Sequence, residues 1–173
     1  WILNGTKHFI SHADIADFAV VFMATGQEKT ARGPKKLITA FIVDKGTKGF
    51  EIRTGYSNVS HRGYTNSILE FNDCRVPGTA VLGEVHNGFR VANTWLGATR
   101  LQVAATCLGR ADRAFQHSLN WASSRKQFGQ QIGKFQGVAF KLADMATEID
   151  AARMLAWRAA WLGKNGQFEN VVA

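Results

Sequence analysis

The side chains able to do acid–base, nucleophilic or metal chemistry stand at spacings that match no common site. The five histidines share no metal-ligand spacing, and none stands four residues from an Asp or Glu. Cys74 and Cys107 are too few for a four-ligand zinc site or a disulfide framework, which favours a reducing compartment. The chain has no G-x-S-x-G, P-loop or Rossmann glycine pattern. We therefore predict no metal site and interpret the histidines as surface or packing residues.

Basic residues are in excess, mainly in the second half of the chain. The 173 residues include 21 Lys plus Arg against 13 Asp plus Glu, which gives a formal charge of +8. Residues 87–173 hold 11 basic and 5 acidic side chains, against 10 and 8 in residues 1–86. Such an excess indicates either a solvated face or an anionic ligand. Because the basic residues are scattered and accompany no nucleic-acid-binding motif, nucleic acid is not a predicted partner.

The composition is that of a folded protein. Hydrophobic residues make up 46% and charged residues 20%, which excludes a disordered or low-complexity chain. No apolar run approaches the roughly 20 residues that a membrane-spanning helix needs. The chain starts at Trp1 and stops at Ala173 without a closing signal, so we expect it to be a piece of a longer protein.

The first half of the chain has the pattern of short β-strands. Asn4–Gly5 is a strong two-residue hairpin signal and predicts a turn between two strands. The polar stretch 26–36 predicts a hairpin loop between apolar runs at 17–24 and 37–43. Further strands are predicted at 49–54 and 67–71. Strands this short and closely spaced suggest a small antiparallel barrel or sandwich.

The second half has the pattern of two long helices. From Asn87 to about Lys126 apolar residues recur every three, four or seven positions, which predicts a helix of roughly 36 residues. Residues 125–133 break this pattern, and a second helix is predicted from about Phe135 to Leu162. Two such helices joined by a short loop form an antiparallel hairpin, whose apolar face requires partner helices. We interpret its four tryptophans, at 95, 121, 157 and 161, as core residues.

Three segments, in order and at the expected spacing, are similar to the acyl-CoA dehydrogenase family. They are WILNGTKHFIS at 1–11, RVPGTAVLGEVHNGF at 75–89 and RKQFGQQIGKFQ at 125–136. The resemblance implies an α+β fold, in which a small antiparallel β-barrel precedes two long antiparallel helices of a four-helix bundle. It implies a central β-barrel domain over residues 1–84 and the first part of the C-terminal helical domain over residues 85–173.

The resemblance implies that FAD is the cofactor and assigns two groups of residues to it. Phe9, Ile10 and Ser11 correspond to the segment beside the isoalloxazine ring, with Phe9 where the family usually has Trp. Phe keeps the flat apolar surface and lacks the indole N–H donor. The Ser11 hydroxyl, where Thr is usual, could donate to flavin N5 or O4, a bond that stabilises the charge of the reduced ring.

The second group is a loop that, in the family, reaches the pyrophosphate end of a neighbouring subunit's FAD. The residues of this group are Arg125, Lys126, Gln127, Phe128, Phe135 and Gln136. A guanidinium binds phosphate oxygens bidentately, and a helix N-terminus adds a favourable dipole. The resemblance thus implies a homo-oligomer, commonly a dimer of dimers.

The resemblance places Gly97, Ala98, Thr99 and Arg100 at the thioester pocket. Many members carry an Asp at the position of Gly97 that meets the CoA, so this chain departs from the family's usual CoA contact. Some branches carry the catalytic base, a Glu, at the position of Thr99, but Thr cannot remove a proton from carbon at neutral pH. We therefore expect the base, a Glu, beyond Ala173, and no dehydrogenase activity from residues 1–173 alone.

The implied reaction is the oxidation of an acyl-CoA thioester to the trans-2-enoyl-CoA, with electrons passed to an electron-transferring flavoprotein. An acyl-CoA oxidase or flavin monooxygenase of the same fold is the alternative within this class, and a non-catalytic basic binding module is the alternative outside it. The implied compartment is the bacterial cytoplasm or the mitochondrial matrix, with the cytoplasm preferred.

Overall fold

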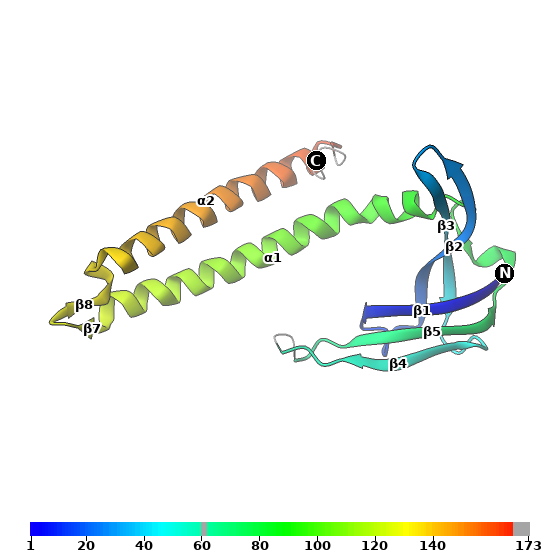
Figure 1. The fold of residues 1–173 in the computed structure, drawn as a ribbon, viewed down its shortest axis with the longest axis horizontal. Helices are drawn as coiled ribbons and strands as arrows, with labels where there is room; N and C mark the ends of the chain where they lie inside the picture. The colour runs from blue at the N-terminus through cyan, green and yellow to red at the C-terminus, as the bar shows by residue number, and fades with distance from the viewer. Residues whose placement is uncertain (60–61, 168–173) are drawn as a thin grey trace. The chain divides into compact units, whose positions relative to one another are not determined.

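The computed structural model describes residues 1–59 and 62–167. The chain divides by its internal contacts into two units, Trp1–Asn93 and Thr94–Ala173. Strands make up most of the first unit, and two long helices make up most of the second (Figure 1). Each unit is described below by itself.

The first unit contains two three-stranded antiparallel sheets. One has the order β1–β5–β4, with β1 at Ile2–Ser11, β4 at Phe50–Tyr56 and β5 at Asn66–Arg75. The other has the order β2–β3–β6, with β2 at Phe18–Thr30, β3 at Gly33–Asp44 and β6 at Val81–Leu82. A short 3₁₀ helix, Gly78–Ala80, precedes β6.

Apolar side chains from both sheets meet in one core. Phe41 and Val43 of β3 and Leu69 and Phe71 of β5 are almost fully buried in the same cluster. Burial of such side chains contributes roughly 1.5–3 kcal/mol each. The buried Thr39 hydroxyl lies 2.6 Å from the Thr25 hydroxyl and accepts from the His86 N–H at 2.8 Å, so it is hydrogen-bonded despite its burial. The predicted small antiparallel β-domain is therefore confirmed.

The predicted hairpin at Asn4–Gly5 is wrong. β1 runs through this dipeptide without turning, and its pairing with β5 shifts register between Leu3 and Gly5. The Asn4 amide instead bonds across the sheet: its Nδ2 donates to Asp73 Oδ1 at 3.1 Å, and its Oδ1 accepts from the Asp73 backbone N–H at 2.8 Å. Pairing with a distant strand thus outweighs the local turn preference. The register shift sets Asn72 and Asp73 of β5 opposite Asn4 alone, and Asp73 takes a left-handed backbone (φ 47°) in this bulge.

The predicted loop at 26–36 is also wrong in extent. β2 continues to Thr30 and β3 begins at Gly33, so the turn is limited to residues 31 and 32. Glu28 lies directly opposite Lys35 in this ladder. Opposite charges at paired positions stabilise a polar two-stranded ribbon, which sequence hydrophobicity does not reveal.

The second unit is a helical hairpin, as the periodicity predicts. Helix α1 spans Gly88–Ser124 with 37 residues, about 55 Å at 1.5 Å per residue. Helix α2 spans Gln136–Lys164 and runs back alongside α1 (Figure 1). Arg153 of α2 donates to Asp112 of α1 at 3.0 Å and also pairs with Asp150 on its own helix.

The interpretation of the helical tryptophans as core residues is wrong for this structure. Trp95, Trp121, Trp157 and Trp161 are 49–62% exposed. In the described part of the second unit, Ala122 is the one hydrophobic residue whose side chain is buried. Two antiparallel helices bury only the stripe where they touch, so their other apolar faces stay open.

Candidate functional site

The first predicted group, Phe9, Ile10 and Ser11, lies at the end of β1, where this strand contains a bulge. Lys7 pairs with Leu69 and Ile10 pairs with Ser67, so His8 and Phe9 together face the single residue Ile68. Phe9 takes a left-handed backbone, with φ 57°, and its side chain is 62% exposed. Bulky residues rarely adopt this conformation, and the ring is thereby turned out of the regular alternation of the strand.

The Phe9 ring stacks on Tyr56 of β4. The ring centroids are 4.3 Å apart and the planes differ by 16°. β1 and β4 are not neighbours, because β5 lies between them and two strand spacings amount to about 9.5 Å. The pairing of β4 with β5 also shifts register, between Thr54 and Tyr56. Two bulges on opposite sides of β5 therefore bring the two rings together.

Ser11 ends β1 beside a second tyrosine. Its hydroxyl oxygen is hydrogen-bonded to the hydroxyl of Tyr64. The Tyr64 and His12 rings also make an edge-to-face contact, with centroids 4.6 Å apart. Ile10, the middle residue of this group, is half-buried and pairs with Ser67. The site therefore joins the β1 end to the segment before β5.

Tyr56 and Tyr64 are the residues that sequence reasoning missed. Tyr56 ends β4 and Tyr64 lies in the segment before β5, and neither belongs to a motif. Their nearness to Phe9 and Ser11 depends on the register of three strands. Both line a cavity of about 770 Å³ whose polar wall includes Asp14, Lys45 and Arg53. Thr65 Oγ1 donates to Asp14 at 2.6 Å, and this bond holds the pKa of the Asp14 carboxyl below its ordinary value.

The second predicted group forms a small hairpin between the helices. β7, Lys126–Gln127, pairs with β8, Gln130–Gln131, around a two-residue turn at Phe128 and Gly129. Both turn residues have positive φ, 51° and 81°, the requirement of a type I′ turn. The Phe128 side chain is 91% exposed at the tip. The Arg125 guanidinium lies 6.0 Å from the Trp121 ring centroid.

The start of α2 completes this group. A 3₁₀ turn, Ile132–Lys134, leads to Phe135, the N-cap of α2, whose carbonyl accepts from Val138 and Ala139. The Phe135 ring meets the edge of Phe128 at 6.2 Å between centroids. Gln136 is the first, exposed residue of the helix. The structure thus brings Arg125–Phe128, Phe135 and Gln136 to one end of the helical hairpin.

The third predicted group, Gly97–Arg100, lies near the other end of the hairpin. The Thr99 hydroxyl donates to the carbonyl of Trp95 at 3.1 Å, within its own helix. Arg125 directly follows the end of α1 and is 25 positions from Arg100, about 38 Å at 1.5 Å per residue. One chain therefore does not bring the loop at Arg125 to the segment at Gly97–Arg100.

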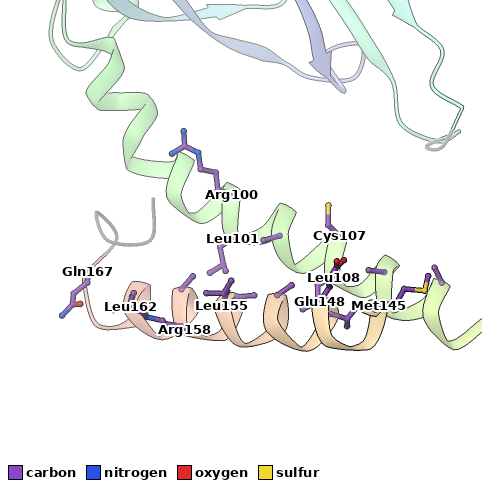
Figure 2. A pocket seen from close by; sticks show the side chains of 17 residues that line it. Arg100, Leu101, Cys107, Leu108, Met145, Glu148, Leu155, Arg158, Leu162 and Gln167 are labelled. Atoms are coloured by element: carbon purple, nitrogen blue, oxygen red, sulfur yellow. The ribbon is translucent and has the colours of Figure 1, made fainter. Parts of the chain in front are cut away.

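A groove of about 1300 Å³ runs between α1 and α2 (Figure 2). Leu101 and Leu108 of α1 face Leu155 and Met145 of α2 across it, whereas Arg100 extends from α1 on the far side. The lining is mostly apolar.

The cysteines and possible metal ligands add no second site. Burial raises the pKa of the Cys74 thiol, which keeps it a packing residue. Over residues 1–59 and 62–167, no cluster of three or more His, Cys, Asp or Glu side chains could hold a metal ion. In the same residues, neither helix is apolar enough over its length to cross a bilayer.

Both halves of the chain match known families. Residues 1–74 match "Acyl-CoA dehydrogenase, middle domain", and residues 86–173 match "Acyl-CoA dehydrogenase, C-terminal domain". The human mitochondrial short-chain specific acyl-CoA dehydrogenase is 39% identical over 165 residues, 95% of this chain and 39% of the relative. Subunit CarC of the caffeyl-CoA reductase–Etf complex of Acetobacterium woodii is also 39% identical, over 95% of this chain and 42% of its own.

Solved structures share the fold over nearly the whole chain. Butyryl-CoA dehydrogenase from Megasphaera elsdenii aligns with a TM-score of 0.80 and 38% identity, over 96% of this chain and 42% of its own. The prolyl acyl carrier protein oxidase AnaB aligns with a TM-score of 0.83 and 32% identity, over 96% of this chain and 43% of its own. PigA with FAD and proline aligns with a TM-score of 0.83 and 28% identity, over 96% of this chain and 42% of its own.

The chain spans about two fifths of the length of each of these proteins. The β-rich first part matches the middle domain and the helical hairpin the C-terminal domain, in the same order along the chain. With family matches over both parts and an α+β fold shared with these structures, the chain belongs to the acyl-CoA dehydrogenase family.

Proposed function

We propose that the protein containing this chain is an FAD-dependent enzyme that oxidises an acyl-CoA thioester to the trans-2-enoyl-CoA. The observation that carries the proposal is the bulged end of β1, which presents an exposed flat ring and a hydroxyl two residues apart. A ring system such as flavin needs an apolar surface to pack against and donors at its heteroatoms. Phe9 supplies the surface and Ser11 the donor.

The side chains of both predicted groups fit FAD by their chemistry. Phe9 is exposed rather than used in the core, and Arg125, Lys126 and Gln127 are exposed donors at the hairpin tip. When bound, FAD supplies the acceptor for the hydride that leaves the acyl β-carbon. The Ser11 hydroxyl would hold the ring at N5 or O4 and stabilise the negative charge of its reduced form.

The Arg125 loop is proposed to act on the FAD of a neighbouring subunit. The guanidinium would bind diphosphate oxygens, and the uncapped backbone N–H groups at the start of α2 would add their dipole. The assignment to a neighbour comes from the family resemblance of residues 125–136. The distance of about 38 Å along α1 separates the loop from the Gly97–Arg100 segment of the same chain, so the two groups make different ligand contacts. The protein is then a homo-oligomer, with a dimer of dimers as the proposed form.

The acyl-CoA is proposed to lie along Gly97–Arg100. The Thr99 hydroxyl already donates to the Trp95 carbonyl, and a Thr hydroxyl is too weak a base to take the α-proton. The base then lies at another position, for which we propose a Glu outside residues 1–173. Electrons would pass to an electron-transferring flavoprotein, in agreement with the similarity to an Etf-complex subunit. Cytoplasm or mitochondrial matrix is the proposed compartment.

Reaction with oxygen is the second candidate function. The similarity to AnaB, which is named a prolyl acyl carrier protein oxidase, favours it. Aerobic turnover that releases hydrogen peroxide would identify the oxidase, whereas turnover that needs an electron-transferring flavoprotein or a dye would identify the dehydrogenase.

The proposed function is tested by flavin content and anaerobic reduction of the intact protein. A yellow protein whose flavin absorbance falls when butyryl-CoA is added without oxygen is the expected result. A colourless protein, or one with flavin that no acyl-CoA reduces, would contradict the proposal. Residues 1–173 alone are expected to show no turnover.

Arg125→Ala tests the loop in the same protein. Loss of charge-assisted hydrogen bonds worth about 1.5–3 kcal/mol should weaken FAD binding roughly ten- to a hundredfold. The FAD affinity of the Arg125→Lys variant should lie between those of the wild type and Arg125→Ala, because an ammonium cannot bind bidentately. Arg113→Ala, which removes an exposed arginine from the middle of α1, is the matched control. Equal FAD affinity in the Arg125→Ala and Arg113→Ala variants would rule out the proposed role of the loop.

A further inference from the structure

The Ser11 hydroxyl has a fixed protein partner, the hydroxyl of Tyr64. Tyr64 belongs to the segment between β4 and β5, 53 positions from Ser11 along the chain. A serine at an exposed strand end would otherwise rotate freely among its rotamers. The contact therefore determines where the Ser11 hydroxyl can point.

Tyr64 is held in place by contacts that do not involve Ser11. The edge-to-face contact with the His12 ring fixes the tyrosine ring. The next residue, Thr65, is held by two hydrogen bonds: its carbonyl accepts from the His12 N–H at 3.1 Å, and its hydroxyl donates to Asp14 at 2.6 Å. The tyrosine hydroxyl thus has a defined position before any ligand binds.

The hydrogen-bonding capacity of the two hydroxyls determines their roles. A serine hydroxyl has one proton to donate and two lone pairs that accept. If Ser11 gives its proton to a flavin heteroatom, its bond with Tyr64 must have the tyrosine as donor. A donated proton polarises the serine O–H and strengthens the bond that it makes in turn.

We propose that Tyr64 is a positioning residue for the flavin: it donates its O–H to Ser11 Oγ and so directs the Ser11 proton towards the ring. This inference rests on the proposed function of the same site. It assigns a role to a residue that carries no part of the motif at the β1 end.

Tyr64→Phe in the intact protein tests the inference, because it keeps the ring and its contact with His12 and removes only the hydroxyl. Loss of a neutral hydrogen bond of about 0.5–1.5 kcal/mol should disfavour two-electron flavin reduction about two- to tenfold. For a two-electron couple this is a midpoint potential about 10–30 mV more negative. We expect kcat to fall by a similar factor, with KM within about twofold of the wild-type value.

Two serine backgrounds separate positioning from packing. In a Ser11→Thr protein, which keeps a hydroxyl at this position, Tyr64→Phe should still lower the potential. In a Ser11→Ala protein, Tyr64→Phe should cause no further change, since the hydroxyl that it orients is gone. Thermal unfolding and flavin content of each variant report whether the fold is retained.

An active yellow protein whose potential is unchanged by Tyr64→Phe would overturn this inference and leave the proposed function intact. The same potential shift in the Ser11→Ala background would also overturn it, since the effect would then be independent of Ser11. A wild-type protein that binds no flavin would overturn both.

Discussion

At the scale of single residues, backbone strain coincides with two of the proposed cofactor contacts. Among residues 1–59 and 62–167, the non-glycine residues with positive φ are Phe9, His12, Asp73, His86 and Phe128. Phe9 and Phe128 are the large apolar residues of this set, and their side chains are 62% and 91% exposed. A non-glycine residue in this region costs on the order of 1 kcal/mol or more, and such strain often accompanies a binding role. We interpret the exposed rings as retained for ligand contact rather than for folding.

Phe128→Asn tests this trade between stability and binding. Asn followed by Gly129 is the preferred pair for a type I′ turn, so the FAD-free variant should be more stable than the wild type by up to about 1 kcal/mol. FAD binding should weaken, because the exposed ring is lost. Urea unfolding and FAD titration measure the two effects. A variant that loses stability, or keeps full FAD affinity, would refute this interpretation.

At the scale of elements, β5 lies between β1 and β4, and each of these two strands contains a bulge. The bulges bring the end of β1 close to the end of β4. The bulge in β4 depends on Gly55, where an added Cβ would lie 1.9 Å from the backbone oxygen of Asn66. No side chain of β5 could move to relieve this overlap, since the obstacle is backbone. The close approach of β4 is thus a condition for the stacking of Tyr56 on Phe9.

Gly55→Ala should therefore separate the end of β4 from β5 and disturb the flavin surface. We expect a loss of stability of about 1–3 kcal/mol, as for other overpacked positions, together with weaker FAD binding. Gly63→Ala is the control, because nothing lies within 4 Å of a Cβ added there. Denaturant midpoints of the two variants provide the comparison, and equal midpoints would show that the contact at Asn66 relaxes without cost.

At the scale of the whole molecule, the two ends of the helical hairpin serve different proposed ligand contacts. Helix α1 is continuous from Gly88 to Ser124, so it fixes the Arg125 loop at a distance from Gly97–Arg100. A rigid spacer of this length suits a loop that completes a neighbour's site in a symmetric oligomer. The exposed apolar groove between the helices is consistent with further helices covering it.

Mixed oligomers test this division between subunits. Phe9→Asp and Arg125→Glu should each abolish activity, yet both positions are exposed, so folding should survive. If the loop acts on a neighbour, a random 1:1 mixture should regain about one quarter of the wild-type sites, where an intact β1 end meets an intact loop. Coexpression with two affinity tags, followed by an activity assay, measures this recovery. No recovery in verified mixed oligomers would place the loop in its own chain's site.

Much of this protein follows from local sequence alone. The periodicity of residues 88–164 predicts both helices to within a few residues, because helical hydrogen bonds and the repeat of side chains on a face are local. The motif at 125–136 identifies the loop between them, and its two positive-φ residues lie at the turn that β7 and β8 share. The family resemblance follows from three short segments and is confirmed by matches over both parts of the chain.

The tertiary structure decided what depends on partners distant in the chain. Asn4–Gly5 has a turn signal, yet β5 pairs with β1 through it, since cross-strand bonds outweigh a preference of two residues. Tyr56 and Tyr64 meet Phe9 and Ser11 only through the register of β1 and β4 on β5, where a shift of one residue would turn the side chains to the other face.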